Sequence, residues 1–174
     1  VGLMRARSVL FQNRDDWELF LKRGFVREPQ VEQLPGSGID LAKFTVTQFP
    51  STKDHEVTIF LMIGRMLWDK GVREFVEAAR IVKRIDPQTE FQLLGDIGSD
   101  NASAISIDQI HSWQEMKLIR YLGLTEDVRG FIRQADCVVL PSYREGLPRT
   151  LLEAGAMGRP VLATRVVGCK DVVE

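Results

Sequence analysis

Two glutamates stand close to a turn that could bind an anion. Glu145 follows a short apolar run, Cys137–Leu140, and Glu153 lies in an apolar segment with seven residues between the two glutamates. Pro148 is at a plausible first position of a helix, because its missing N–H would have no helical partner there. A helix start presents unpaired N–H groups and the positive end of the helix dipole, which attract anions. Carboxylates would repel an anion, so we expect them to bind uncharged groups instead.

Two cations lie near the end of another apolar run. Gly64 and Arg65 follow 57–63, and Lys70 stands at the expected start of a helix over 69–84. Ligands of doubly wound sheets bind outside the carboxyl ends of the strands. Arg65 could pair with a surface acid while Lys70 is solvated. Alternatively, both could bind a diphosphate, since Arg offers a planar fork of donors and Lys a point charge.

Glu153 needs a hydrogen-bonding partner, because a carboxylate among apolar neighbours is costly to bury. A structural partner elsewhere in the chain would satisfy it. The alternative is a vicinal diol, since two ribose hydroxyls can donate to one carboxylate. Glu145 could likewise accept from sugar hydroxyls, and the backbone N–H groups near Arg149 and Thr150 could bind diphosphate oxygens. On this interpretation the site binds a nucleotide sugar.

Apolar segments alternate with helical patterns along the chain, which predicts an α/β fold. We expect a Rossmann-like, doubly wound, mainly parallel sheet with helices on both faces. The expected strands are 8–11, 31–34, 57–63, 91–94, 118–121, 137–140 and 161–163. The expected helices are one capped by Asn13, one over 69–84, one capped by Thr125, one from Pro148, and one beginning within 167–174. Between them we expect a turn at 35–38, an extended linker, and a polar stretch over 95–115.

The composition is that of an ordinary globular protein. The chain has 174 residues, of which 44% are hydrophobic and 27% charged, with a net charge of −1. This balance does not favour nucleic acid or an anionic membrane as an electrostatic partner. Two cysteines fit reduced thiols, and two histidines are too few for a His/Cys metal site. No signal peptide or membrane-spanning run is present, so we expect a cytoplasmic protein.

Several catalytic motifs are absent from the sequence. There is no P-loop, no G-x-S-x-G and no Asp-x-Asp pair, which removes P-loop phosphoryl transfer, the hydrolase elbow and a common metal–diphosphate ligand. The segment 36–38 begins a dinucleotide fingerprint but lacks the third glycine, and is interpreted as a structural turn. His55 and His111 lie in polar surroundings and are not expected to be catalytic.

The cation pair and the glutamate pair together resemble a known family. Gly64-Arg65-x-x-x-x-Lys70-Gly71, Glu145-Gly146-Leu147-Pro148 and the Glu145–Glu153 spacing resemble the donor-binding half of a retaining glycosyltransferase of family four, which has the GT-B fold. The similarity is strongest to the bacterial group that builds capsule, exopolysaccharide, O-antigen or lipid-linked oligosaccharide. Further matching segments are 11–13, 36–40 and 158–160.

The resemblance implies roles for the matching positions. Arg65 and Lys70 would bind the donor diphosphate and stabilise charge on the leaving nucleotide, and with Glu145 they would form the catalytic set. Glu145 would contact the transferred sugar and Glu153 the ribose. The family requires no metal or other cofactor. The donor-binding set that it implies is Gly64, Arg65, Lys70, Arg120, Tyr121, Glu145, Gly146, Leu147, Pro148, Arg149, Thr150 and Glu153, with Arg120 and Tyr121 framing the base.

The resemblance also divides the chain. It implies a segment near an interdomain boundary at 1–44, a linker at 45–56, and a donor-binding domain at 57–174 that lacks its C-terminal helices. The acceptor domain is expected to lie outside this chain, so the fragment alone should be inactive. The whole enzyme would transfer a hexose or N-acetylhexosamine from a UDP-sugar to a glycan or lipid-linked acceptor in the synthesis of cell-surface polysaccharide. It would act in the cytoplasm, with peripheral association at the inner face of the membrane. The alternatives are a non-catalytic nucleotide-sugar binding module and a GT-B epimerase or phosphorylase.

Overall fold

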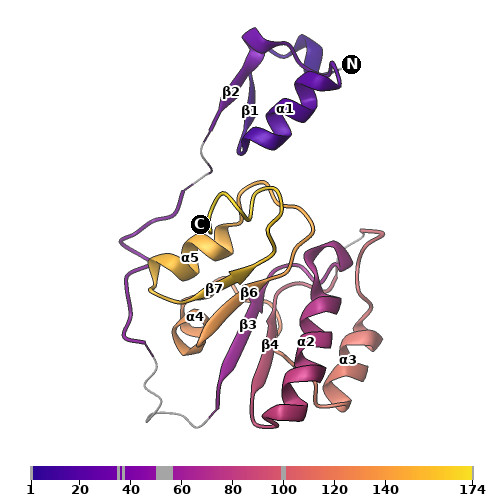
Figure 1. The fold of residues 1–174 in the computed structure, drawn as a ribbon, viewed down its shortest axis with the longest axis vertical. Coiled ribbons are helices and arrows are strands. Elements are labelled where there is room, and N and C mark those ends of the chain that lie inside the picture. Colours follow the sequence, from indigo (N-terminus) through magenta and orange to yellow (C-terminus); the bar gives the residue numbers. More distant parts are fainter. Residues whose placement is uncertain (1, 35, 37, 50–56, 99–100, 174) are drawn as a thin grey trace.

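The computed structural model describes residues 2–34, 36, 38–49, 57–98 and 101–173. These residues form a small N-terminal unit and a larger domain built on a five-stranded sheet (Figure 1). Part of the expected turn at 35–38 and residues 50–56 of the expected linker lie outside the described residues. Residues 45–49 contain no helix or strand.

The N-terminal unit is a parallel β–α–β unit, as the sequence predicts. Strands β1 (Val9–Phe11) and β2 (Val31–Gln33) are parallel neighbours, and helix α1 (Arg14–Lys22) connects them. Asn13 caps α1, because its side-chain oxygen accepts a hydrogen bond from the backbone N–H of Asp16 at 2.8 Å. Two 3-10 turns complete the unit, Leu3–Arg5 and Glu28–Gln30.

The larger domain has a fully parallel sheet with strand order β5-β4-β3-β6-β7. The chain enters at the centre, fills one side and then returns to fill the other, which makes β3 and β6 the point where the winding direction reverses. Ligands bind at this position in doubly wound sheets. The strands are β3 (Ile59–Ile63), β4 (Glu90–Leu94), β5 (Arg120–Tyr121, shorter than expected), β6 (Cys137–Leu140) and β7 (Val161–Ala163).

Helices cover both faces of the sheet, which confirms the predicted doubly wound fold (Figure 1). Phe60 and Met62 of β3 pack in a core with the helices of one face, and Leu61 and Ile63 pack with those of the other. Successive side chains of a strand point to opposite faces, so one apolar run fills both cores. The helices are α2 (Val72–Ile85) and α3 (Ile107–Glu115) on the first face, and α4 (Arg129–Gln134) and α5 (Arg149–Ala156) on the second.

The expectation of a continuous polar stretch over 95–115 is wrong, because α3 lies in its second half. Ser106 caps this helix by accepting a hydrogen bond from the backbone N–H of Gln109 at 3.2 Å. Ile110 and Trp113 are its buried residues. Two apolar side chains three positions apart are enough to attach a short helix to the core, although they make a weak periodic signal.

Thr125 does not cap a helix, contrary to the sequence-based expectation. Its hydroxyl accepts a hydrogen bond from the backbone N–H of Asp127, which makes a local turn. The Asp127 carboxylate then accepts from the backbone N–H of Arg129 at 3.0 Å, where α4 begins. The expected helix within 167–174 is also not formed among the described residues there, which make a series of turns.

Two residues of the expected site lie outside the helices to which the sequence assigned them. Pro148 is the N-cap residue of α5 and precedes its first helical position. Lys70 ends a 3-10 turn, Trp68–Lys70, that comes before α2. Gly71 separates that turn from the helix with a φ of +78°, a left-handed conformation that a helix cannot continue through.

A buried arginine holds the chain that leads from the N-terminal unit to β3. Arg159 is 3% exposed, and its guanidinium donates to the carbonyl oxygens of Ile132, Arg133, Thr47 and Gln48 at 2.8–3.3 Å. Five N–H donors in a rigid fork allow one arginine to satisfy this many carbonyl groups. Arg159 thereby attaches the connecting segment to the α4 side of the domain.

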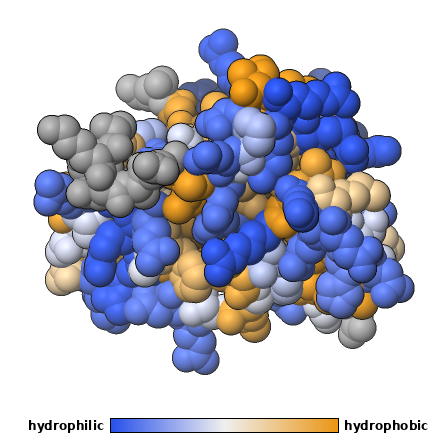
Figure 2. Space-filling view, turned by 90° about the horizontal axis from the view of Figure 1, so that it is seen from below, coloured by the Kyte–Doolittle hydropathy of each residue, from blue (hydrophilic) through white to orange (hydrophobic). Residues whose placement is uncertain are grey.

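The carboxyl ends of the strands point toward the N-terminal unit, and the opposite end of the domain has a mixed surface (Figure 1). Figure 2 views that opposite end from below and shows hydrophilic residues over much of it, with hydrophobic residues interspersed. Within the described part of the chain, no helix is long and apolar enough to cross a membrane.

Candidate functional site

The centre of the site is an ion pair between Lys70 and Glu145. The Lys70 Nζ lies 2.6 Å from one carboxylate oxygen of Glu145 and 2.7 Å from the other. The two side chains are only 18% and 13% exposed. Lys70 comes from the turn after β3 and Glu145 from the turn after β6, so the pair bridges the point where the winding of the sheet reverses. The structure therefore brings together two of the three residues expected to be catalytic.

Gly71 permits this approach of the two turns. A Cβ added to it would lie 2.0 Å from the carbonyl oxygen of Pro141, at the end of β6. The turns are also joined by hydrogen bonds, because the backbone N–H of Tyr143 and the hydroxyl of Ser142 both donate to the carbonyl oxygen of Asp69. The glycine after Lys70 is thus needed for the close contact that places Lys70 against Glu145.

Arg65 follows Gly64 after the end of β3, and its side chain is exposed. Its side chain makes no hydrogen bond or ion pair with any residue that the structure describes, so the interpretation that it pairs with a surface acid is not supported there. Its neighbour Gly64 donates its backbone N–H to Leu94, and a Cβ on Gly95 would lie 1.9 Å from the Gly64 carbonyl oxygen. Arg65 is a cation available to a ligand at the end of β3.

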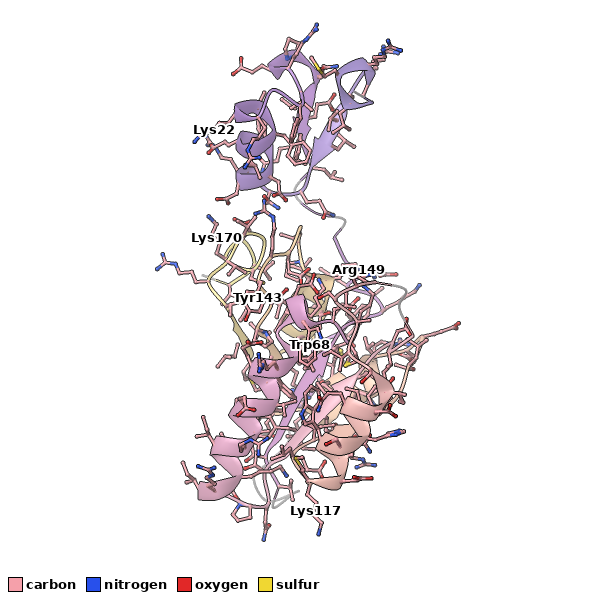
Figure 3. All side chains as sticks on the ribbon, turned by 90° about the vertical axis from the view of Figure 1, so that its right-hand side faces the viewer. Lys22, Trp68, Lys117, Tyr143, Arg149 and Lys170 are labelled. Atoms are coloured by element: carbon pink, nitrogen blue, oxygen red, sulfur yellow. The ribbon has the colours of Figure 1, made fainter. Side chains whose placement is uncertain are left out.

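The start of α5 supplies backbone donors beside the pair. The N–H groups of Arg149 and Thr150 have no backbone acceptor among the described residues, as is usual in the first turn of a helix. The Thr150 hydroxyl contacts the carbonyl oxygen of Ile63 at 3.4 Å, which holds the helix start at the end of β3. Figure 3 shows Arg149, Tyr143 and Trp68 at the end of the domain that faces the N-terminal unit, and Lys117 at the opposite end.

Glu153 is a buried carboxylate with one long hydrogen bond. It is 8% exposed, and Arg149, whose side chain is 64% exposed, donates to it at 3.3 Å. Burial raises the pKa of the Glu153 carboxyl, and the charge and hydrogen bond of Arg149 act in the opposite direction. A structural partner therefore exists, but one long bond from an exposed side chain leaves most of the acceptor capacity of the carboxylate unused.

An open cavity of about 610 Å³ adjoins Glu153. The residues that line it are Lys43, Phe44, Glu126, Asp127, Val128, Arg129, Arg149 and Glu153. Arg129 donates to both oxygens of Asp127 at 2.8 Å, and these hydrogen bonds lower the pKa of Asp127 to about 2. Residues 126–129 were not among the candidate site residues predicted from the sequence. This segment follows the carboxyl end of β5, so the rule that ligands bind at the carboxyl ends of strands could have identified it.

Arg120 and Tyr121 were expected from the resemblance to frame the base, and this role stays a prediction. Arg120 is exposed and lies 3.9 Å from Glu90, the first residue of β4, which places its charge toward the amino-terminal edge of the sheet. The Tyr121 hydroxyl donates to the carbonyl oxygen of Gly95 at 2.6 Å, and burial raises the pKa of that hydroxyl. Tyr121 supports the loop after β4, and neither residue lines the cavity beside Glu153.

The fold and the site define a class of protein. A parallel sheet wound in both directions, with cations and carboxylates gathered at the reversal of winding, is a Rossmann-like domain of the GT-B type. Residues 57–174 match the model of the family described as glycosyl transferases group 1, and the chain belongs to this family. The predicted family and fold are confirmed.

Individual relatives agree with this assignment. The chain is 31% identical over 178 residues to the N,N'-diacetylbacillosaminyl-diphospho-undecaprenol alpha-1,3-N-acetylgalactosaminyltransferase of Campylobacter jejuni. It is 25% identical to the UDP-Gal:alpha-D-GlcNAc-diphosphoundecaprenol alpha-1,3-galactosyltransferase of Escherichia coli. Each alignment covers 97% of this chain and 45% of the relative, so the chain spans slightly less than half the length of these relatives.

A solved structure also has the same fold. The HepE protein of Anabaena, crystallised in complex with UDP-glucose, superposes with a TM-score of 0.79 at 20% sequence identity. The superposition covers 98% of this chain and 48% of HepE. Since it includes nearly all of this chain, both the N-terminal β–α–β unit and the five-stranded domain belong to the shared fold.

The burial of Glu153 predicts a pH dependence of stability. Its folded pKa is raised, so between its ordinary value of 4.5 and that raised value the folded protein keeps a proton that the unfolded chain releases. Stability then falls as the pH rises through this range. We expect Glu153→Gln to remove this loss of stability. Without ligand, and at pH values above the folded pKa of Glu153, the variant should be more stable than the wild type. Chemical denaturation at several pH values between about 4.5 and 8 measures the difference.

The matched control for this experiment is Glu115→Gln at the exposed end of α3. Its stability should stay close to that of the wild type, because its side chain is exposed. A pH-independent difference for Glu153→Gln would show that the folded protein does not hold this proton, and would contradict the prediction.

Proposed function

We propose that this chain is the donor-binding part of a retaining glycosyltransferase that uses a UDP-sugar. The observation that carries the proposal is the partly buried Lys70–Glu145 pair at the reversal of winding, with Glu153 buried at the neighbouring helix. Cations and backbone donors for a diphosphate lie there beside carboxylates for hydroxyl groups. A nucleotide sugar carries both kinds of group, because its charged diphosphate lies between the hydroxyl groups of the ribose and those of the transferred sugar.

Each part of the donor then has a partner in the chain. The diphosphate would contact Lys70, Arg65 and the N–H groups at the start of α5, which supply positive charge without a metal ion. The ribose hydroxyls would donate to Glu153, and the base would enter the cavity next to it. The transferred sugar would donate from its hydroxyls to Glu145. As the sugar leaves, Lys70 and Arg65 would stabilise the negative charge that develops on UDP.

The relatives support the choice of donor and acceptor class. The name of the Escherichia coli relative specifies a UDP-galactose donor, and HepE was crystallised with UDP-glucose. Both curated relatives act on diphospho-undecaprenol acceptors, as their names state. We therefore propose a hexose or N-acetylhexosamine donor linked to UDP, and a lipid-linked or glycan acceptor in cell-surface polysaccharide synthesis. The acceptor would bind in a part of the protein outside residues 57–174. Sugar transfer would occur on the cytoplasmic side of a membrane.

Calorimetric titration of the 174-residue chain tests the donor assignment. We expect heat on addition of UDP, UDP-galactose or UDP-N-acetylglucosamine, and weaker binding of GDP-mannose. Glu153→Ala should weaken UDP binding by about tenfold or more, because two ribose hydroxyls lose a charged acceptor. Glu115→Ala, far from the site, should bind as the wild type does.

Two results would redirect the proposal. A folded wild-type chain that binds none of the nucleotides, or a Glu153→Ala variant that binds as tightly as the wild type, would contradict the donor site. Binding by the chain combined with no transfer by any longer protein that carries it would favour the alternative, a non-catalytic nucleotide-sugar binding module.

A further inference from the structure

The first turn of α1 is attached to the turn that carries Glu145. The side-chain amide of Asn13 donates to the carbonyl oxygen of Gly146 at 2.9 Å, across 133 positions of sequence. Asn13 is 2% exposed, although it is polar and lies in a small unit outside the main domain. Among the described residues, no other side chain donates a hydrogen bond to the Gly146 carbonyl oxygen.

Helix capping alone does not explain an asparagine at this position. The cap uses only the side-chain oxygen, which accepts from the N–H of Asp16, and serine, threonine or aspartate could do the same. The amide group of Asn13 makes two more hydrogen bonds, one to the Asp16 carboxylate at 2.9 Å and one to Gly146. The second of these reaches the donor-site turn, and an amide is needed to make it.

The surrounding contacts make the attachment close. A Cβ added to Gly146 would lie 2.5 Å from the side-chain oxygen of Gln12, so the two parts meet at a glycine. Two ion pairs flank this contact. Asp16 pairs with Arg144, and Asp15 lies 2.9 Å from the Nζ of Lys170.

Within the turn, few other bonds determine the position of Glu145. Its own backbone N–H donates to Val167, and its carboxylate receives Lys70. Without the bond from Asn13, the Gly146–Leu147 peptide unit would keep no described side-chain partner. The orientation of a carboxylate depends on its backbone, so the contact to Gly146 bears directly on where the Glu145 side chain points.

We propose that Asn13 is a positioning residue for the donor site. Through the Gly146 carbonyl it fixes the 144–147 turn, so that Glu145 faces Lys70 and the sugar of the donor. The donor-site turn is thus coupled to the N-terminal unit, and a displacement of α1 changes how the sugar is held. This inference rests on the proposed function, because it assigns Glu145 to the sugar.

Hydrogen exchange of the ligand-free chain tests the attachment without any assumption about the donor. Asn13→Ser keeps the capping oxygen and removes the amide. We expect the amides of 143–147 to exchange about fivefold faster in this variant, as the loss of one buried hydrogen bond implies. Arg14→Ala is the matched control, because Arg14 is an exposed neighbour whose ion-pair partner among the described residues is Glu18, also in α1. It should leave exchange in 143–147 unchanged.

Ligand affinities test the positioning role. Asn13→Ser should bind UDP within twofold of the wild type and bind UDP-galactose, UDP-glucose or UDP-N-acetylglucosamine about fivefold more weakly, since only the sugar reaches Glu145. A purely structural role would weaken UDP and UDP-sugars equally, which would overturn the proposal. Unchanged exchange in 143–147 together with unchanged UDP-sugar affinity would also overturn it.

A second variant keeps the test decisive if Asn13→Ser does not fold. Arg144→Met breaks the ion pair with Asp16 from the donor-site side and leaves the cap of α1 intact. It should change exchange and UDP-sugar affinity in the same direction, and wild-type behaviour would contradict the coupling. If the wild type binds no UDP, the proposed function fails, and the exchange experiment still decides whether Asn13 holds the turn.

Discussion

Removing one partner of the Lys70–Glu145 pair is expected to destabilise the domain more than removing both. Each side chain is mostly buried, so Lys70→Met leaves an unpaired Glu145 carboxylate and Glu145→Gln leaves an unpaired ammonium group. We expect each single change to lower the free energy of unfolding by about 2–3 kcal/mol. The double variant replaces the pair with neutral groups, and its loss should be about 1 kcal/mol, smaller than that of either single change.

The control for this cycle is the ion pair between Arg14 and Glu18 in α1. Its side chains are 78% and 63% exposed, and its distance of 2.7 Å is nearly the same as that of the site pair. Exposed pairs of this spacing contribute about 0.3–0.5 kcal/mol. Urea denaturation of both cycles measures the two coupling energies. Equal coupling energies would show that burial does not strengthen the site pair.

The same pair should also limit ligand binding. When a donor arrives, Lys70 is expected to share its charge between Glu145 and the diphosphate. In Glu145→Gln, Lys70 is free for the phosphate, so UDP should bind at least as tightly as in the wild type. UDP-sugars should lose the advantage of a charged acceptor for their hydroxyls, and their affinity should approach that of UDP.

Gly71→Ala is expected to cause a large loss of stability although it adds only one methyl group. The residue has a φ of +78°, and the added Cβ would lie 2.0 Å from a backbone oxygen of Pro141 that belongs to the end of β6. The left-handed conformation costs about 1–2 kcal/mol for alanine. Displacement of a packed backbone adds to this, and we expect a total of about 3 kcal/mol or more.

Gly123→Ala provides the matched control for Gly71→Ala. Gly123 has a similar φ of +81°, but nothing lies within 4 Å of its added Cβ. It should therefore show only the conformational cost, about 1–2 kcal/mol. Thermal and urea unfolding of both variants measure the difference. If the two substitutions cost the same, the contact between the turn after β3 and the end of β6 is not tight, and the position of Lys70 would need another explanation.

The parts of the site that sequence predicted are those whose chemistry is local. A glycine-rich turn, a proline and a carboxylate in an apolar helix can each be interpreted from their immediate neighbours, which is why Lys70, Glu145 and Glu153 were identified as site residues. The buried run of β3 likewise predicts a strand covered on both faces. The existence and type of long, strongly patterned elements follow from the chain alone.

The parts that sequence missed depend on contacts between distant segments. Asn13 was predicted as a helix cap, but its bond to Gly146 joins positions that no local pattern relates. The cavity segment 126–129 became apparent only when the fold placed the start of α4 on the same cavity as Arg149 and Glu153 of α5. The family resemblance placed Arg120 near the base, but it could not predict that the Arg120 side chain approaches Glu90, the first residue of the neighbouring strand β4. Strand position does not determine the direction of a long side chain.

The Arg159 anchor changes the effective concentration of the N-terminal unit at the donor site. Measured along the chain from the end of β2, its contacts with Thr47 and Gln48 come at roughly half the distance to the first residue of β3. For a tether of given stiffness, local concentration rises roughly as the inverse three-halves power of length, so halving it gives an increase of about threefold. A single buried guanidinium on the α4 side would thus help Asn13 to re-form its hydrogen bond to Gly146 after any separation of the two parts.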